Sequence, residues 1–205
     1  MTIPSDAELH QIVEKVVRRT FQSTPPPAPE SLADDAITPA PGPNRPQDGA
    51  RPRIGAVALG ADHGGYALKE ALKSSLREGG YQVVDCGTHS PDSVDYPDFA
   101  AAVARLVSEG EAWRGIVIDG AGIGSCIVAN KFPGVRAAMC YDHATAVNSR
   151  EHNDANVLTL GAGLVGPSLA GQIAKTWLET DFSGGRHTRR VEKINAVERN
   201  FLKSP

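Results

Sequence analysis

The stretch from Gly115 to Lys131, GIVIDGAGIGSCIVANK, constrains the fold of this chain more than any other. It opens with a short apolar run that is typical of the end of a buried strand, and the run Gly-Ala-Gly-Ile-Gly then turns the backbone tightly. A helix is predicted to begin near Ser125. Glycines let backbone N–H groups approach a ligand, and the N–H groups of a helix's first turn have no partner within the helix. The stretch therefore predicts an anion site in an α/β protein.

One carboxylate, that of Asp119, stands at the exit of this strand. A group that can take a proton thus lies beside groups that can hold negative charge on oxygen, which is the pairing that an enediolate requires. Glycine-rich turns of this kind are also common at nucleotide and phosphate sites. The carboxylate argues against a plain dinucleotide site, because it would repel a pyrophosphate.

From Ile54 onward, strand segments alternate with helical segments, which predicts a parallel sheet covered by helices on both faces, a three-layer α/β/α sandwich. Ligands of such sheets bind at the carboxyl ends of the strands. Several polar residues fall near strand ends, and we expect them to converge on one edge: Asp62, His63, Asp119, His152, Asn153 and Asp154. The predicted strands cover residues 54–62, 81–86, 115–119, 135–140 and 156–160.

The first residues of the chain have a different character. Residues 5–21 place apolar side chains at spacings of three and four, which predicts an amphipathic helix, and Ser5 with Glu8 forms a capping-box pattern. Residues 23–53 hold nine of the fifteen prolines and few bulky apolar residues, as in a stiff, solvated linker. We therefore divide the chain into a targeting helix (1–22), a linker (23–53) and an enzyme domain (54–205).

An amphipathic helix on such a linker can dock on its own domain, mediate oligomers, lie on a membrane or bind another protein. Its polar face carries Asp6, Glu8 and Glu14, whereas a lipid-binding face would be mostly basic, so we predict no membrane binding. Helix and linker together resemble the encapsulation peptides that lead cargo enzymes into bacterial microcompartments. The resemblance implies a shell protein as partner of residues 1–22 and a cytoplasmic location inside a microcompartment.

Composition excludes several other classes of protein. A net charge of -3 and an aromatic content of 5% give no reason to expect nucleic-acid binding. Three cysteines, Cys86, Cys126 and Cys140, lack the spacing of metal ligands and are interpreted as reduced thiols of a cytosolic protein. No signal peptide or membrane-spanning run is predicted.

Five segments of the chain resemble, in order, those of the B-type ribose-5-phosphate isomerases, a family that includes allose-6-phosphate and galactose-6-phosphate isomerases. The resemblance implies an aldose–ketose isomerase that needs no cofactor or metal, acts on a sugar phosphate, and forms a homodimer or tetramer whose active sites are shared between subunits. The matching segments are GADHGGYALK (60–69), DYPDFA (95–100), GAGIGSCIVANK (120–131), REHNDANVL (150–158) and GGRHTRRVEKI (184–194).

The resemblance also implies residue roles. Asp119 matches the position of the base that removes the C2 proton, and His152 matches the residue that assists opening of the sugar ring. His187 is interpreted as a supporting residue. The residues that match substrate contacts, among them phosphate ligands and N–H donors of the glycine loop, are Asp62, His63, Tyr96, Gly120, Gly122, Gly124, Asn153, Arg186 and Arg190.

The chain departs from the family pattern at the base. Many members carry a cysteine at position 119 and another branch a glutamate at position 125, where this chain has Asp119 and Ser125. Ala121 replaces a threonine or serine that helps to activate the cysteine. An aspartate is ionised near neutral pH and needs no activating hydroxyl. Three hypotheses stay open. Asp119 is the base for ribose 5-phosphate, or another sugar phosphate is the substrate and Asp119 contacts it, or the chain binds sugar phosphate with little turnover.

Overall fold

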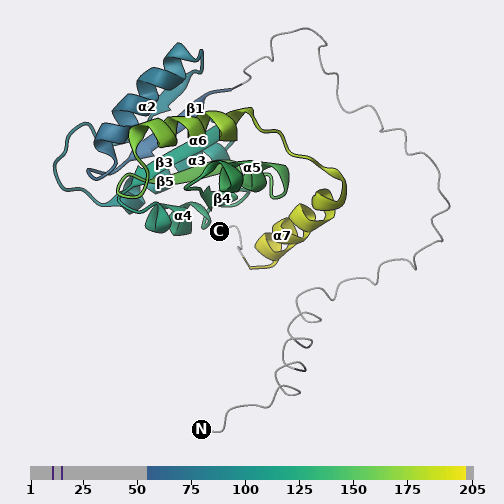
Figure 1. The fold of residues 1–205 in the computed structure, drawn as a ribbon. Helices are drawn as coiled ribbons and strands as arrows, with labels where there is room; N and C mark the ends of the chain where they lie inside the picture. The colour runs from purple at the N-terminus through teal and green to yellow at the C-terminus, as the bar shows by residue number, and fades with distance from the viewer. Residues whose placement is uncertain (1–10, 12–14, 16–54, 202–205) are drawn as a thin grey trace. The chain divides into compact units, whose positions relative to one another are not determined.

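The computed structural model describes residues 55–201 and, apart from them, Gln11 and Lys15, which are both helical and exposed. The remainder of the predicted targeting helix and all of the predicted linker lie outside the described residues. Five parallel strands form one sheet in the order β2-β1-β3-β5-β4 (Figure 1). The strands are β1 (Val57–Ala61), β2 (Val83–Asp85), β3 (Arg114–Asp119), β4 (Ala137–Met139) and β5 (Val157–Gly161).

Helices cover both faces of the sheet, which confirms the predicted three-layer α/β/α sandwich. One face packs against the α2, α5 and α6 helices, and the other packs against α3 and α4. A short 3-10 turn, η1 (Gly185–His187), then leads into the last helix, α7 (Thr188–Phe201). The other helices are α2 (Tyr66–Glu78), α3 (Tyr96–Ser108), α4 (Ile123–Ala129), α5 (His143–Glu151) and α6 (Pro167–Glu179).

The three central strands, β1, β3 and β5, are buried along their whole length. The two edge strands are shorter than predicted, with three residues each. An edge strand pairs with a neighbour on one side only, so fewer of its residues are held in the ladder. Among the residues that the structure describes, no helix combines the length and the apolar composition that crossing a bilayer requires.

The α3 helix begins at Tyr96, although the residue pattern from Asp98 onward alone predicts a start two residues later. Pro97 lies in its first turn, where a missing N–H removes no helical hydrogen bond, and Asp95 is the N-cap residue. This earlier start makes Tyr96 the first residue of the helix.

A buried ion pair joins α2 to the edge strand β2. The Lys69 side chain is 0% exposed, and its Nζ atom lies 2.9 Å from each Asp85 carboxylate oxygen and 2.8 Å from Glu70. Lys73 contacts the same Asp85 carboxylate at 2.7 Å. Burial alone would raise the pKa of Asp85, but the hydrogen bonds from Lys73 and Lys69 outweigh it and lower this pKa to about 2.

We expect Asp85→Asn to lower the free energy of unfolding at pH 7 by about 2 kcal/mol or more, because it leaves the buried ammonium of Lys69 short of its main partner. A folded-state pKa below the unfolded value stabilises the protein above about pH 4, and this contribution is lost as the pH falls towards 2. Urea unfolding at several pH values measures both effects. The exposed control Glu111→Gln should keep the acid dependence of the parent, and an equally steep dependence in Asp85→Asn would contradict the assignment.

Candidate active site

Asp62 and His63 follow β1 at the carboxyl edge of the sheet. The Asp62 side chain is buried, and its Oδ1 atom accepts a hydrogen bond from the Gly65 N–H at 3.0 Å. The His63 Nδ1 atom lies 3.2 Å from the N atom and 3.0 Å from the carbonyl oxygen of Val94. A Cβ atom on Gly64 would lie 3.6 Å from the Gly120 N atom, so the turn after β1 packs against the glycine loop after β3.

The Asp119 carboxylate lies beneath the glycine loop and is 4% exposed. Its Oδ1 atom accepts hydrogen bonds from the N–H groups of Ala121, at 2.8 Å, and Gly122. Its Oδ2 atom accepts from the Ser125 N–H at 3.0 Å and from the Ser125 hydroxyl at 2.5 Å. A carboxylate offers about four lone-pair sites, so these donors fill all of them. In this geometry Asp119 ties the loop and the start of α4 to the end of β3.

The glycine loop also packs tightly on the end of β5. Gly122 has a φ of 79°, and a Cβ atom there would lie 2.9 Å from the backbone of Leu160. The Thr159 hydroxyl donates a hydrogen bond to the Gly122 carbonyl at 2.8 Å. Gly122 therefore allows the loop to pack closely on β5, and its N–H group donates a hydrogen bond to Asp119 in this structure.

Tyr96 lies over the backbone of Gly124. A Cβ atom on Gly124 would lie 2.5 Å from two carbon atoms of the Tyr96 ring, which is 39% exposed. Contacts thus join the turn after β1, the loop after β3 and the start of α3. We call the predicted site residues at this edge the carboxyl-edge group: Asp62, His63, Tyr96, Asp119, Gly120, Gly122 and Gly124.

A second set of predicted residues lies together at the end of α5 and the start of α7. The rings of His152 and His187 are stacked, with centroids 4.1 Å apart and planes 5° apart. The Arg186 Nε–H donates a hydrogen bond to His187 Nε2 at 3.3 Å. Burial lowers the pKa of His187, and the neighbouring His152, Arg186 and Arg190 side chains lower it further. We call this set the histidine–arginine group: His152, Asn153, Arg186, His187 and Arg190.

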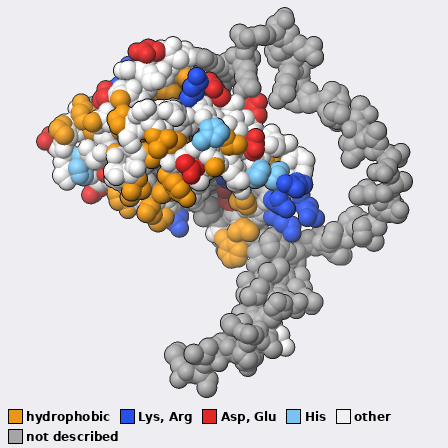
Figure 2. All heavy atoms as spheres, in the orientation of Figure 1, with side chains coloured by type: hydrophobic (Ala, Val, Ile, Leu, Met, Phe, Trp, Pro, Cys, Tyr) orange, Lys and Arg blue, Asp and Glu red, His pale blue; other side chains and the backbone are white. Residues whose placement is uncertain are grey.

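Figure 2 shows Lys and Arg side chains gathered beside histidine, at the end of the molecule that carries α7. The His187 Nδ1 atom is buried and has no hydrogen-bond partner among the described residues. A buried polar atom without a partner is costly, so this atom is available to bond water or another polar group.

The two groups lie at opposite edges of the sheet, which corrects the prediction that their polar residues converge on one edge. The α5 helix runs antiparallel to the strands, so its last turn lies at the amino edge of the sheet. His152 follows this helix and comes shortly before Val157, the first residue of β5. Asp119 is paired with Gly161, the last residue of β5. A five-residue strand spans about 13 Å or more between its ends. The predicted site residues of one chain therefore form two separate groups.

Asp154 supports the turn that carries His152 and Asn153. It has a φ of 47°, which is unusual for a residue other than glycine, and its carboxylate contacts Arg136 at 2.9 Å and Arg150 at 2.8 Å. The sequence places Asp154 near the predicted site residues and does not indicate this ion-pair role. Its only sequence signal is a carboxylate four residues after an arginine on a helix.

Neither a metal site nor a reactive thiol accompanies these groups in the described part of the chain, where no three or more His, Cys, Asp or Glu side chains gather around one point. Burial raises the pKa of the Cys126 thiol, whose Sγ atom lies 3.5 Å from the Ala137 carbonyl. This thiol therefore lacks the environment of a proton-abstracting group.

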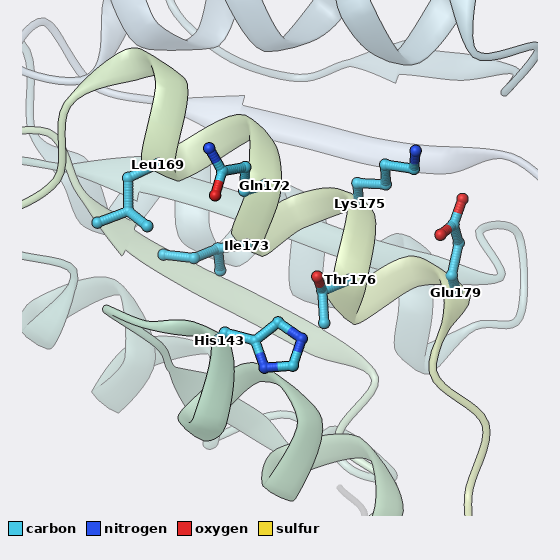
Figure 3. A pocket seen from close by; sticks show the side chains of 7 residues that line it. All are labelled: His143, Leu169, Gln172, Ile173, Lys175, Thr176 and Glu179. Carbon is cyan, nitrogen blue, oxygen red and sulfur yellow. The ribbon is translucent and has the colours of Figure 1, made fainter.

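One hollow on the surface of the domain contains none of the predicted site residues, whereas another is bounded by one of them. A groove of about 290 Å³ between α5 and α6 has an apolar floor of Leu169 and Ile173, and its lining includes none of the predicted site residues (Figure 3). Another hollow, of about 260 Å³, is bounded by Asn153 and by Ile194 of α7.

The parallel sheet carries a carboxylate within a loop of N–H donors, and the chain also has a cluster of imidazole and guanidinium groups. These features are typical of an α/β enzyme that acts on a small anionic substrate. The family model described as Ribose/Galactose Isomerase matches residues 57–194. The chain belongs to this family, which confirms the predicted resemblance of this part of the chain to sugar-phosphate isomerases and the predicted enzyme class, an aldose–ketose isomerase.

Similar proteins cover most of the described domain. Ribose-5-phosphate isomerase B of Escherichia coli is 46% identical over 142 residues, which are 69% of this chain and 95% of that protein. D-erythrulose-4-phosphate isomerase of Pectobacterium atrosepticum is 41% identical over 144 residues, 69% of this chain and 94% of that protein. The structure of ribose-5-phosphate isomerase B from Clostridium thermocellum is 52% identical, with a TM-score of 0.70, and the match covers 71% of this chain and 99% of that one.

We expect Gly124→Ala to raise the KM for substrate severalfold, because the added methyl group collides with the Tyr96 ring and displaces it from the loop. Steady-state kinetics measure this change. The matched control is Gly171→Ala in the α6 helix, where a Cβ atom meets nothing within 4 Å and where alanine favours the helix by about 0.5–1 kcal/mol. In a Tyr96→Ala background the further cost of Gly124→Ala should vanish, and a cost that persists there would contradict the steric explanation.

Proposed function

We propose that this chain is an aldose–ketose isomerase that interconverts ribose 5-phosphate and ribulose 5-phosphate through an enediolate. The observation that carries the proposal is the Asp119 carboxylate held within a loop of backbone N–H donors at the carboxyl edge of the sheet. The names of the Escherichia coli and Clostridium thermocellum relatives support ribose 5-phosphate as the substrate.

In the proposed reaction, Asp119 is the base. The C2–H bond of the open-chain aldose breaks, the proton goes to Asp119 Oδ2, and the electron pair forms the C1=C2 bond while the C1 oxygen becomes negative. N–H groups of the loop that are not bonded to Asp119 stabilise this oxygen. The proton of the O2 hydroxyl then passes to O1, the C2=O bond forms, and the proton held by Asp119 returns to C1, which completes the ketose.

This role requires a change at Asp119, because four hydrogen bonds occupy its lone-pair sites in the structure. Two N–H groups reach Oδ1, and the N–H and hydroxyl groups of Ser125 reach Oδ2. The three N–H groups are fixed by the loop, whereas the Ser125 hydroxyl rotates about single bonds. We propose that this hydroxyl turns away when substrate binds and so opens one Oδ2 site for the proton.

The remaining predicted residues fit substrate binding by their chemistry. Guanidinium groups are suited to phosphate oxygens, and we propose Arg186, Arg190 and His63 as the phosphate ligands. Asp62, Tyr96 and Asn153 are proposed to contact sugar hydroxyls, and His152 is proposed to assist opening of the sugar ring.

We propose that a second copy of the chain completes the site. The two groups lie at opposite edges of the sheet in one chain, so a single sugar phosphate cannot contact both within that chain. Two sets of exposed apolar side chains are suited to a dimer interface, Ile123 and Ile127 on α4 and Ile194, Val197 and Phe201 on α7. Figure 2 shows hydrophobic side chains gathered around the position of α4. Either a homodimer or a tetramer built from it satisfies this requirement.

Mixing two inactive variants tests the base and the shared site together. We expect Asp119→Asn and His152→Ala each to lose on the order of a hundredfold in kcat for ribose 5-phosphate, the scale of a lost acid–base group. Co-assembly of the two in equal amounts should restore about a quarter of the parent rate, because half of the dimers are mixed and each mixed dimer has one intact site of two. Ketose formation by the purified full-length protein is the measurement.

The control mixes two variants of the same group, for example Asp119→Asn with Tyr96→Ala. Each site of such a mixed dimer carries one of the two changes, so no intact site forms and the rate should not exceed the mean of the two variants' own rates. If Asp119→Asn retains the parent rate, Asp119 is not the base. If the Asp119 and His152 variants both fold and form mixed dimers without recovery, the proposed division of the site between two copies is wrong.

A second substrate is favoured by one observation, the similarity to a D-erythrulose-4-phosphate isomerase. Two further alternatives are the isomerisation of six-carbon sugar phosphates of the allose or galactose type and the binding of a sugar phosphate without turnover. A tetrose 4-phosphate cannot close a five-membered ring through its esterified O4, so it needs no ring opening. Rates with four-, five- and six-carbon aldose phosphates, measured side by side, therefore assign the substrate class.

We further propose that residues 1–22 direct the enzyme into a bacterial microcompartment by binding a shell protein. The apolar stripe of residues 5–21, followed by the proline-rich segment, supports this proposal. A reporter fused to residues 1–22 should gather at shells in shell-forming cells, as fluorescence microscopy would show. The same fusion with Val13→Asp, which breaks the apolar stripe, should stay diffuse. A diffuse distribution of the parent fusion would contradict the proposal.

A further inference from the structure

A chain of hydrogen bonds assigns the proton on His152. The Asn148 Nδ2 atom lies 2.8 Å from His152 Nδ1, one helical turn away along α5. An amide nitrogen is a donor only, so in this arrangement His152 Nδ1 is an acceptor and carries no proton. A neutral imidazole then has its proton on Nε2.

The orientation of the Asn148 amide is itself determined by Asn153. The Asn153 Nδ2 atom donates to the Asn148 main-chain carbonyl at 3.3 Å, and this carbonyl can only accept. The same Nδ2 atom lies 3.5 Å from Asn148 Oδ1. Reversing the Asn148 amide would place two NH₂ groups against each other, so its NH₂ group belongs on the side of His152.

The proton of the stacked His187 ring is assigned in the same way. His187 Nε2 accepts from the Arg186 Nε–H, and arginine has no acceptor, so a neutral His187 carries its proton on Nδ1. This Nδ1 atom is the buried atom that lacks a partner among the described residues. The histidine–arginine group therefore presents N–H donors from two neutral rings and two guanidinium groups.

We propose that Asn148 is a positioning residue that holds His152 as a neutral imidazole with its proton on Nε2. In this state His152 acts on a sugar oxygen as a hydrogen-bond donor and does not remove the proton of a sugar hydroxyl. The inference rests on the proposed function, since it assigns the form in which His152 assists ring opening.

The groups around the histidine pair favour a neutral His187. Burial lowers the pKa of His187, and the neighbouring His152, Arg186 and Arg190 lower it further, whereas the Glu151 carboxylate at the end of α5 opposes them. A donor that stays neutral keeps its N–H group as the pH rises, whereas an imidazolium loses a proton.

The test replaces the amide of Asn148 by a carboxylate. Asn148→Asp keeps the size of the side chain but can only accept, so it should move the neutral-state proton of His152 from Nε2 to Nδ1. Nitrogen-15 spectra of the full-length protein with labelled histidine, assigned with a His152→Gln variant, report which ring nitrogen carries the proton. The parent should show the proton on Nε2 and Asn148→Asp should show it on Nδ1.

Kinetics provide the second readout. Above the pH at which its His152 becomes neutral, Asn148→Asp should lose about tenfold or more in kcat, because Nε2 no longer donates to the sugar oxygen, while the parent keeps its rate. Gln172→Glu in α6 makes the same exchange of amide for carboxylate in the groove of Figure 3 and should keep the parent's pH profile.

A parent spectrum with the proton on Nδ1, or an Asn148→Asp profile that matches the parent's, would overturn the inference. The spectra do not depend on turnover. If the protein converts no sugar phosphate but its spectra match the expectation, the proposed function fails and the assignment of the His152 proton by Asn148 stands.

Discussion

The position of the candidate site depends on the hydrogen bonds between the Asp119 carboxylate and the loop that follows it. They hold the start of α4 against the end of β3, and the loop in turn packs on the end of β5 at Gly122. Tyr96 and the turn after Asp62 lie against the same loop. A carboxylate suits this place because it accepts from several N–H groups at once and favours a helix N-terminus. Its structural and proposed catalytic roles therefore compete for the same lone pairs.

The direction of the helices explains why the predicted site residues of one chain fall into two groups. In a parallel sheet each connecting helix returns from the carboxyl edge to the amino edge, so residues that end a helix lie opposite residues that end a strand. His152 ends α5 and Asp119 ends β3. Placing His152 beside Asp119 thus requires a second chain, and exposed apolar side chains on α4 and α7 are available for that contact.

Much of the fold could be predicted from the sequence, because buried strands and amphipathic helices have distinct periodicities. The leucines of α2, Leu68, Leu72 and Leu76, are buried as their spacing indicates. The site was predicted residue by residue only through family resemblance, and the expected convergence on one edge was wrong because spacing along the chain does not show which way a helix returns. The hydrogen bonds of Asp119 and the amide of Asn148 depend on side-chain orientation, for which no sequence motif exists.

The two parts of the site differ in what they can exchange with a substrate. The carboxyl-edge group contains the carboxylates of Asp62 and Asp119, which can accept protons, whereas the histidine–arginine group, with His152 held by Asn148, presents donors. An isomerase needs proton acceptors as well as hydrogen-bond donors, since a proton must leave carbon while negative charge is held on oxygen. If both histidines were free to accept protons, a second base would stand beside the sugar oxygens and could promote loss of protons other than the one on C2. Fixing His152 as a donor leaves the removal of the C2 proton to the carboxylate, so a single base acts on the sugar.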